Sequence, residues 1–445
     1  MRSDFKRRMD LSQFNRSSSM VDSPALFEEM LSIGDVQRMS SRCVFCKGSK
    51  MLCGKDRCSV LARFFSAAKV RSRIDQLDID GASPPSVFIG RVGYPQVSIG
   101  PMVPPYHGDT SLMDTPERWV GLPLEQIIDF RSSLVRGMHR VDIHDVENSS
   151  RLVTRTRELA LARNTPDVYA SFTRKPHGNL TVDDDVQPFG PSAPLQKFDI
   201  SNVKFDNRIE RAFFDTDLLA RDAIVSLYKD GTLVSNIQRA FSVGAFGVGK
   251  RRRFVPTRWS ITAVDSQLGL DLLESTKTYP LINEYRVYET TSLDNRWAIL
   301  MMPTSWRYEL IEAWYPKTAW NPFGSRIAIM SDHEFFDGRS TYASIGGCYY
   351  AARLAVNELF ARERRQAGVC ILRESHPGYI LPIGVWNVRE NVRVALRSPP
   401  KRFPTMEQAL LHISSVMDIP MSRWIKSSAI LKDALYQRRI DDIWG

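Results

Sequence analysis

Four of the six cysteines in this 445-residue chain lie within sixteen residues of one another: Cys43, Cys46, Cys53 and Cys58. The first two form a Cys-x2-Cys pair with a glycine just after it, a sequence in which a tight turn points two thiolates at one ion. Zinc is bound by four such sulfur atoms at about 2.3 Å, and metal binding then supplies folding free energy locally. We therefore expect one structural Zn²⁺ in a small N-terminal knuckle.

Two disulfides are the alternative use of the same four cysteines. The N-terminal residues, Met-Arg-Ser-Asp-Phe-Lys-Arg-Arg-Met-Asp, lack the apolar core of a signal peptide, and no stretch approaches the apolar length of a membrane span. We therefore expect a soluble, cytoplasmic protein. Because thiols stay reduced in that compartment, zinc is favoured over disulfides.

The bulk composition is that of a globular protein, with 43% hydrophobic and 25% charged residues, and the length allows two lobes. The formal net charge is +10. Such a surplus favours a polyanionic partner, because lysine and arginine release counterions from phosphates when they bind. Nucleic acid is therefore the first partner to consider.

Changes in composition along the chain predict its organisation. The first forty residues are polar and basic, and proline, glycine and the acidic run Asp183-Asp184-Asp185 indicate a surface loop or lobe boundary between Lys175 and Lys197. The expected parts are a flexible basic arm (1–40), the zinc-knuckle module (41–70), a first lobe (71–180), a second mixed α/β lobe (198–432) and a C-terminal peptide (433–445).

The secondary structure expected in the body is mixed. In the first lobe the residues from Ser86 predict two short strands interrupted by glycine and proline, Asp114–Trp119 predicts a helix start, and Leu124–Leu134 a helix. Helices are expected at Thr216–Tyr228, Ser235–Phe241 and Ser344–Arg365, with one more that ends at Leu396 and another that begins near Met406. Strands are expected at Tyr285–Glu289, Trp297–Met302 and Ala367–Leu372, with a short one that ends at Val385. The fold class is α+β (mixed α/β).

The last nine residues have the spacing of a docking peptide, with anchors at Gln437, Ile440, Ile443 and Trp444. A single 3₁₀ turn would bring the three apolar residues to one side while the glutamine reaches a polar pocket. The alternative is that this tail packs on its own body. The spacing resembles the PIP box by which replication and repair proteins bind the sliding clamp (PCNA), with isoleucine where an aromatic residue more often stands.

The chain as a whole resembles the archaeal Nre family of DNA repair proteins, and the terminal box places it with the clamp-binding branch. The resemblance rests on the cysteine knuckle, on Phe88-Ile-Gly-Arg-Val-Gly-Tyr-Pro, Asp114-Thr-Pro-Glu-Arg-Trp, the run from Val255 to Asp265, Arg373-Glu-Ser-His-Pro-Gly-Tyr and the run from Gly384 to Arg393. It implies a role in the repair of damaged DNA. It supplies no catalytic assignment.

A basic loop is the first candidate for DNA contact. Gly244 to Lys250 has the G-x4-G-K spacing of a phosphate loop, but Arg251 stands where serine or threonine should hold magnesium, so the loop is not that of an NTPase. We interpret it as a glycine-hinged loop that contacts DNA phosphates, and a solvated charged turn is the alternative. The residues expected to contact DNA are Lys250, Arg251, Arg252, Arg253 and Arg258.

A possible catalytic cluster lies farther along the chain. Glu374 and His376 are two residues apart at the end of a predicted buried strand, so their side chains share one face where site residues often leave a sheet. Arg389, on the next predicted helix, is expected to converge on them. Further candidates for the same cleft are Arg91, Asp114 and Arg118. A structural ion-pair network is the alternative.

Two functions from different classes follow. The leading hypothesis is a nucleoid-associated DNA repair factor, held on the sliding clamp by its C-terminus and on DNA by the zinc knuckle and the basic loop. The second is a repair enzyme, a nuclease, lyase or hydrolase, in which Glu374 and His376 act as acid and base. An RNA-binding protein is a third, weaker alternative.

Overall fold

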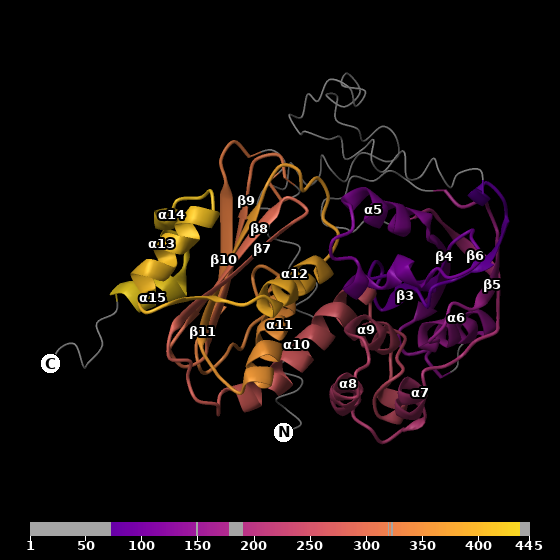
Figure 1. Ribbon diagram of the computed structural model, residues 1–445. Helices are drawn as coiled ribbons and strands as arrows, with labels where there is room; N and C mark the ends of the chain where they lie inside the picture. Colours follow the sequence, from indigo (N-terminus) through magenta and orange to yellow (C-terminus); the bar gives the residue numbers. More distant parts are fainter. Residues whose placement is uncertain (1–72, 148–149, 178–189, 319, 322–323, 437–445) are drawn as a thin grey trace.

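The computed structural model describes residues 73–147, 150–177, 190–318, 320–321 and 324–436. Within them the chain forms two six-stranded sheets with a group of helices between them (Figure 1). The mixed α/β fold class expected from the sequence is confirmed for this part of the chain. The four knuckle cysteines and the C-terminal anchors from Gln437 onward lie outside the described residues.

The first sheet has the strand order β1-β5-β6-β4-β3-β2. Its neighbouring strands are antiparallel except β4 and β6, which are parallel. Alternate residues such as Val97 and Ile99 point into a shared apolar core because side chains along a strand alternate between its two faces. The strands are β1 (Asp78–Ala82), β2 (Val87–Ile89), β3 (Gln96–Val103), β4 (Val135–Asp142), β5 (Asp167–Phe172) and β6 (Ser192–Ser201).

Helices pack on this sheet and complete its core. Ile237 of α9 and Leu227 of α8 belong to the same apolar cluster as the strands. The helices of this part are α5 (Leu124–Ser133), α6 (Arg151–Leu161), α7 (Asn207–Phe214), α8 (Ala220–Lys229) and α9 (Val234–Ser242). The second lobe was expected to begin at residue 198. Strand β6 begins before that residue and extends the first sheet to Ser201, and residues 192–242 pack with the first sheet.

The second sheet has the order β10-β9-β11-β8-β7-β12. Strand β11 is buried along its whole length, because helices cover both faces of the sheet (Figure 1). Trp297, Ile299 and Met301 pack toward α11 and α12, whereas Ala298 and Leu300 pack toward α13–α15. The strands are β7 (Tyr285–Ser292), β8 (Asn295–Met302), β9 (Arg307–Trp314), β10 (Ala328–Glu334), β11 (Gly368–Ser375) and β12 (Lys401–Phe403).

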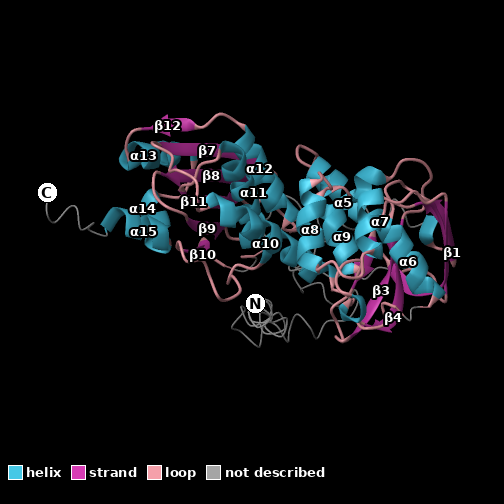
Figure 2. Cartoon of the chain, turned by 90° about the horizontal axis from the view of Figure 1, so that it is seen from below, coloured by secondary structure: helices cyan, strands magenta, loops and turns pink. Residues whose placement is uncertain are grey.

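Helix α10 joins the two halves. It spans Thr257–Thr276 and packs along α11, and Figure 2 shows both helices between the sheets. Leu268 of α10 belongs to the first apolar core, and Leu273 to the second. The remaining helices are α11 (Gly347–Glu363), α12 (Trp386–Arg397), α13 (Met406–Val416), α14 (Met421–Ser427) and α15 (Ala429–Tyr436). In the described part of the chain, no helix combines the length and the apolar character needed to cross a bilayer.

Most of the expected elements are confirmed, two differ, and several observed elements were not expected. Residues 111–118 form two 3₁₀ turns, η4 (Ser111–Asp114) and η5 (Pro116–Arg118), in place of an α-helix start. The segment after His376 is irregular up to Val385, so the short strand expected there was wrong. The twenty-residue α10 was not predicted, because it is buried on several sides and carries no single apolar stripe.

Candidate functional site

The basic loop follows helix α9 and is largely buried, but several of its basic side chains reach solvent. Gly244 has a φ of +69°, and a Cβ added there would lie 2.8 Å from the backbone oxygen of Arg253. A glycine is therefore required where the two ends of the loop approach each other. The loop then forms the 3₁₀ turn η6 (Gly249–Arg251). The side chains of Lys250, Arg251, Arg253 and Arg258 are exposed.

Arg252 differs from its neighbours. It is only 8% exposed, and its guanidinium donates hydrogen bonds to the backbone oxygens of Gly247, Phe213 and Asp215 at 2.7, 2.6 and 2.8 Å. The same group lies over the ring of Phe213, 5.5 Å from its centroid. Because these contacts occupy the guanidinium and burial withholds it from solvent, Arg252 fastens the loop to the end of α7. Arg252 therefore does not belong with the exposed cations of the loop.

The turn between β2 and β3 lies against the start of α10. The backbone N–H of Ile89 donates to the Thr257 hydroxyl at 2.9 Å, and the rings of Tyr94 and Trp259 are 5.1 Å apart. Trp259 is buried, which agrees with a role in the core. This contact places the exposed Arg91 of the turn beside the first turn of α10, where Arg258 lies.

The end of β4 joins the same surface. The backbone N–H of Ile143 donates to Pro95 O at 3.1 Å, and that of Phe254 donates to Ile143 O at 2.9 Å. Three exposed segments are therefore neighbours in space although they are far apart in sequence. We call their exposed cations the basic surface: Arg91, Arg140, Lys250, Arg251, Arg253 and Arg258.

Carboxylates also lie on these segments. Asp142 accepts hydrogen bonds from the Gln96 amide at 2.8 Å and from the backbone of His144 at 2.9 Å. Asp145 and Glu147 follow it and are exposed. The six cations outnumber these three carboxylates.

Glu374 and His376 contact each other at the end of β11, as the sequence indicated. His376 Nε2 lies 3.2 Å from a carboxylate oxygen of Glu374. The same carboxylate accepts the backbone N–H groups of Asp418 at 3.1 Å and Ile419 at 2.7 Å. Since Glu374 is completely buried, these two N–H groups supply the hydrogen bonds that its burial demands. The residue anchors the segment between α13 and α14 to the sheet.

Two further groups complete this cluster. The Asp418 carboxylate lies 3.9 Å from His376 Nε2 and pairs with Arg296, and the ring of Tyr315 stacks on the imidazole with centroids 4.3 Å apart. Burial, then the nearby carboxylates, raises the pKa of Tyr315 to about 12, so its phenol stays neutral. Glu374, His376 and Asp418 form a group of metal-ligand type. No pattern in the sequence predicts Asp418 as part of this group, because it is 44 residues from Glu374.

Arg389 belongs to a different network. It is 1% exposed, and its Nη1 donates to both carboxylate oxygens of Asp265 at 2.7 and 3.0 Å. Its Nε donates to Glu390 at 3.1 Å, and its Nη2 lies 4.0 Å from Glu117. Among the described residues no hydrogen bond or ion pair joins Arg389 to Glu374 or His376, so the expected convergence is not seen there.

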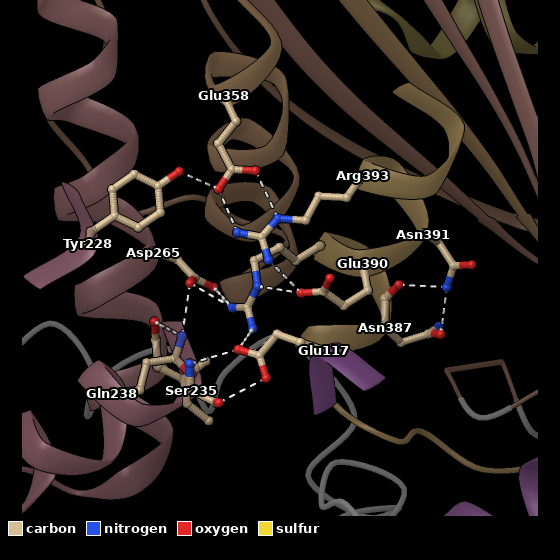
Figure 3. Close-up of polar contacts among 12 residues, drawn as sticks. Glu117, Tyr228, Ser235, Gln238, Asp265, Glu358, Asn387, Glu390, Asn391 and Arg393 are labelled. Atoms are coloured by element: carbon tan, nitrogen blue, oxygen red, sulfur yellow. Dashed lines mark hydrogen bonds and ion pairs between the residues drawn. The ribbon is translucent and has the colours of Figure 1, made fainter. Parts of the chain in front are cut away.

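Polar contacts extend this network across the junction of the two halves (Figure 3). The Glu358 carboxylate accepts from the Tyr228 hydroxyl at 2.7 Å and from Arg393 Nε at 2.8 Å. Glu117 accepts from the backbone and hydroxyl of Ser235 at 2.9 and 2.8 Å, and the Gln238 amide donates to Asp265 at 2.9 Å. We call this set the junction network: Glu117, Tyr228, Ser235, Gln238, Asp265, Glu358, Arg389, Glu390 and Arg393.

The electrostatics of the junction network are those of a structural element. Four carboxylates face two guanidiniums, and burial raises the pKa of Asp265 to about 6 although Arg389 and Arg393 oppose the shift. Burial and the neighbouring Glu358 also raise the pKa of Tyr228 far above its usual range. Each charge is held by a partner, as buried charges must be. The network therefore fastens α8, α9 and η5 to α10, α11 and α12.

The other catalytic candidates lie in two places. Asp114 pairs with Arg131 at 2.6 Å, and Arg118 is exposed beside Glu117, so both are on the segment that meets Arg389. Arg91 belongs to the basic surface. The six candidates are thus divided among the Glu374–His376 cluster, the junction and the basic surface.

These features define a two-sheet α/β protein with a basic surface on its first half and a buried polar junction. The chain belongs to the archaeal Nre family: the description "Archaeal Nre, N-terminal" matches residues 52–321 and "Archaeal Nre, C-terminal" matches residues 334–443. This confirms the family resemblance inferred from the sequence. No solved structure matches the chain.

Relatives with assigned names are similar over most of the chain. It is 40% identical to "DNA repair protein NreB" of Archaeoglobus fulgidus over 391 residues, which are 88% of this chain and 97% of the relative. It is 36% identical to "DNA repair protein NreA" of the same organism over 84% of this chain and 93% of the relative. "DNA repair protein NreA" of Haloferax volcanii is 30% identical over 77% of this chain and 84% of that protein.

Proposed function

We propose that this protein acts in DNA repair as a DNA-binding factor held on the sliding clamp. The names of its relatives support the repair role. The observation that carries DNA binding is the basic surface, where three segments far apart in sequence place exposed cations side by side. In this proposal the zinc knuckle makes a second contact with DNA, and the C-terminal peptide tethers the protein to the clamp.

The physical basis is the attraction between these cations and DNA phosphates. Each phosphate neutralised by lysine or arginine releases condensed counterions, which makes binding strong at low salt and weak at high salt. Contacts of this kind position a protein on DNA without reading its sequence. A tether to the clamp raises the effective concentration of DNA near this surface, so modest contacts suffice.

Removing two of these cations tests DNA binding. The double variant Arg253→Ala/Arg258→Ala is expected to bind a 20–30 base-pair duplex about tenfold or more weakly at roughly 0.15 M salt, because about two phosphate contacts are lost. The slope of log affinity against log salt should fall by about 2 for the same reason. Fluorescence anisotropy across a salt series measures both quantities.

A matched control keeps the change in net charge the same. Arg362 and Arg365 are exposed at the end of α11, which neighbours the end of α10 because Gln366 donates to Lys277 O at 3.0 Å. Helix α10 has twenty residues, so this end lies about 30 Å from Arg258. Arg362→Ala/Arg365→Ala should leave DNA affinity nearly unchanged. Equal losses in the two double variants would show that net charge, and not this surface, governs binding.

The zinc knuckle is tested by metal content. Protein purified without added metal is expected to hold one equivalent of zinc, and Cys46→Ser should lower this to a small fraction, because a four-sulfur site loses one ligand. Cys348→Ser is the control, since burial raises the pKa of that thiol and it lies outside the cysteine cluster. Zinc retained in full by Cys46→Ser, measured by mass spectrometry of the metal, would contradict the proposal.

A repair enzyme is the second candidate, and the group formed by Glu374, His376 and Asp418 favours it. An ion held there would bring an imidazole and two carboxylates to metal-assisted hydrolysis. However, two backbone N–H groups already occupy Glu374, and Asp418 pairs with Arg296. This arrangement supports an anchoring role more directly than a catalytic one, so we place the binding function first.

A further inference from the structure

The turn between β2 and β3 carries an unusually exposed aliphatic side chain. Val92 is 81% exposed, more than Leu411 at 74% or any other exposed large hydrophobic residue in the described part of the chain. A single exposed apolar residue needs no explanation in itself. The surroundings of Val92 distinguish it, because it projects from the basic surface.

The turn is held in place from both sides. The Tyr94 ring packs on Trp259, and the backbone N–H of Tyr94 donates to Arg91 O at 3.3 Å. On the other side, Arg140 Nη1 donates to Val92 O at 3.5 Å, a weak contact that places the guanidinium along the turn. Val92 therefore sits at the tip of a supported protrusion.

Glycine at position 93 makes this geometry possible. Its φ is +82°, a conformation that other residues adopt at a cost, and an added Cβ would lie 2.8 Å from Arg140 Nη2. The guanidinium can therefore approach the backbone directly behind the valine. The apolar tip and a cation are placed side by side.

This arrangement of an apolar tip and neighbouring cations is complementary to the surface of duplex DNA. Arg91 and Arg140 flank the tip, and Arg253 and Arg258 lie on the neighbouring segments. In a duplex, apolar base faces lie between two rows of phosphates. Proteins that distort DNA insert an apolar side chain between base steps while arginine and lysine hold the backbone. An apolar tip flanked by cations fits that pattern.

We propose that Val92 is a wedge that enters the base stack of duplex DNA while the basic surface holds the phosphates on either side. The proposal rests on the DNA-binding function proposed above and adds its preferred substrate. Unstacking a base step costs a few kcal/mol, and the cost is least where a base is already unpaired. The protein should therefore prefer DNA with a local defect, such as a single-nucleotide bulge or gap.

Two duplexes of equal length test the wedge, one intact and one with a single-nucleotide gap next to 2-aminopurine. The full-length protein is expected to bind the gapped duplex about fivefold or more tightly than the intact one and to raise the 2-aminopurine fluorescence as the base unstacks. Val92→Ser should lose the preference and the fluorescence change, yet keep its affinity for the intact duplex within about twofold, because the cations that hold phosphates remain.

Control variants separate the wedge from folding and from DNA binding. Leu411→Ser alters another highly exposed aliphatic side chain, on α13, and should behave as the unchanged protein. If Val92→Ser retains the gap preference and the fluorescence change, the wedge is overturned while DNA binding stands. If the unchanged protein binds neither duplex even at low salt, the proposed function fails, and the wedge with it.

Discussion

Replacing Arg389 with alanine is expected to lower the free energy of unfolding by about 3–5 kcal/mol, because one partner of a buried ion pair is left without compensation. The Asp265 carboxylate is completely buried and receives two hydrogen bonds from this guanidinium. After the substitution, the Gln238 amide is the side-chain hydrogen-bond donor to this carboxylate that remains among the described residues. Urea denaturation of the variant and the unchanged protein measures the difference.

The loss should also depend on pH, with a definite sign. Burial already raises the pKa of Asp265 to about 6, and Arg389 opposes that shift, so the pKa rises further in the variant. A raised carboxyl pKa means that the folded state binds a proton that the unfolded state releases, so stability falls as pH rises through the folded-state pKa. The variant should therefore be more destabilised at pH 8 than at pH 6.

Arg151 provides the matched control. It pairs with Asp199 at 2.8 Å, but its side chain is 72% exposed. Exposed pairs contribute little because water and salt screen them, so Arg151→Ala should cost less than about 1 kcal/mol and show little pH dependence. Should Arg389→Ala prove no more destabilising than this control, the junction network would not be what holds the two halves together.

Deleting residues 437–445 is expected to abolish measurable binding to a PCNA-type sliding clamp. Burying each of the anchors Ile440, Ile443 and Trp444 contributes roughly 1.5–3 kcal/mol, so the peptide supplies several kcal/mol and a dissociation constant on the order of micromolar. Without the peptide this contribution to clamp binding is lost. Isothermal titration calorimetry with the purified clamp measures the change.

The polar residues between the anchors give the control for this deletion. Asp441→Asn/Asp442→Asn leaves every anchor in place and should retain binding. If the truncated protein binds the clamp as well as the full chain does, the docking peptide is excluded. A truncated protein that loses thermal stability instead would favour the alternative in which the tail packs on its own body.

DNA affinity offers an independent readout of the same truncation. The basic surface lies beside the first sheet, on β2–β3, β4 and the basic loop with the start of α10. Loss of the C-terminal peptide should therefore leave duplex binding in the absence of clamp unchanged. We therefore expect clamp binding and DNA binding to be lost in different variants.

Several elements of the fold could be predicted from local patterns. Strands β7 and β8 and helices α5 and α11 lie close to the expected ranges, because their apolar positions recur with the period of the element. Helix α10 escaped prediction because both apolar cores contact it, which removes the single stripe that marks a surface helix. The 3₁₀ turns at 111–118 also escaped, since a proline early in a turn is compatible with either kind of helix.

The candidate sites, like the fold, could be predicted only in part from local patterns in the sequence. Glu374 and His376 could be paired from the sequence, because residues two apart on a strand share a face. Asp418 could not be added to them, because it reaches the cluster from the segment between α13 and α14. The arginines expected to contact DNA could be recognised in the sequence. Arg252 is an exception, because its guanidinium donates to three backbone carbonyl oxygens inside the protein.

Short-range chemistry can be predicted from the order of the residues, because the predictions of a cysteine knuckle, a basic loop and terminal anchors each concern neighbouring positions. Burial and long-range pairing cannot, because they depend on which elements pack together. Arg252 and Arg253 are adjacent, yet one is buried and the other faces water. Arg389 meets Asp265 across 124 residues only because α10 and α12 pack at the junction, and a hydrogen bond forms only between groups that the folded chain brings to about 3 Å.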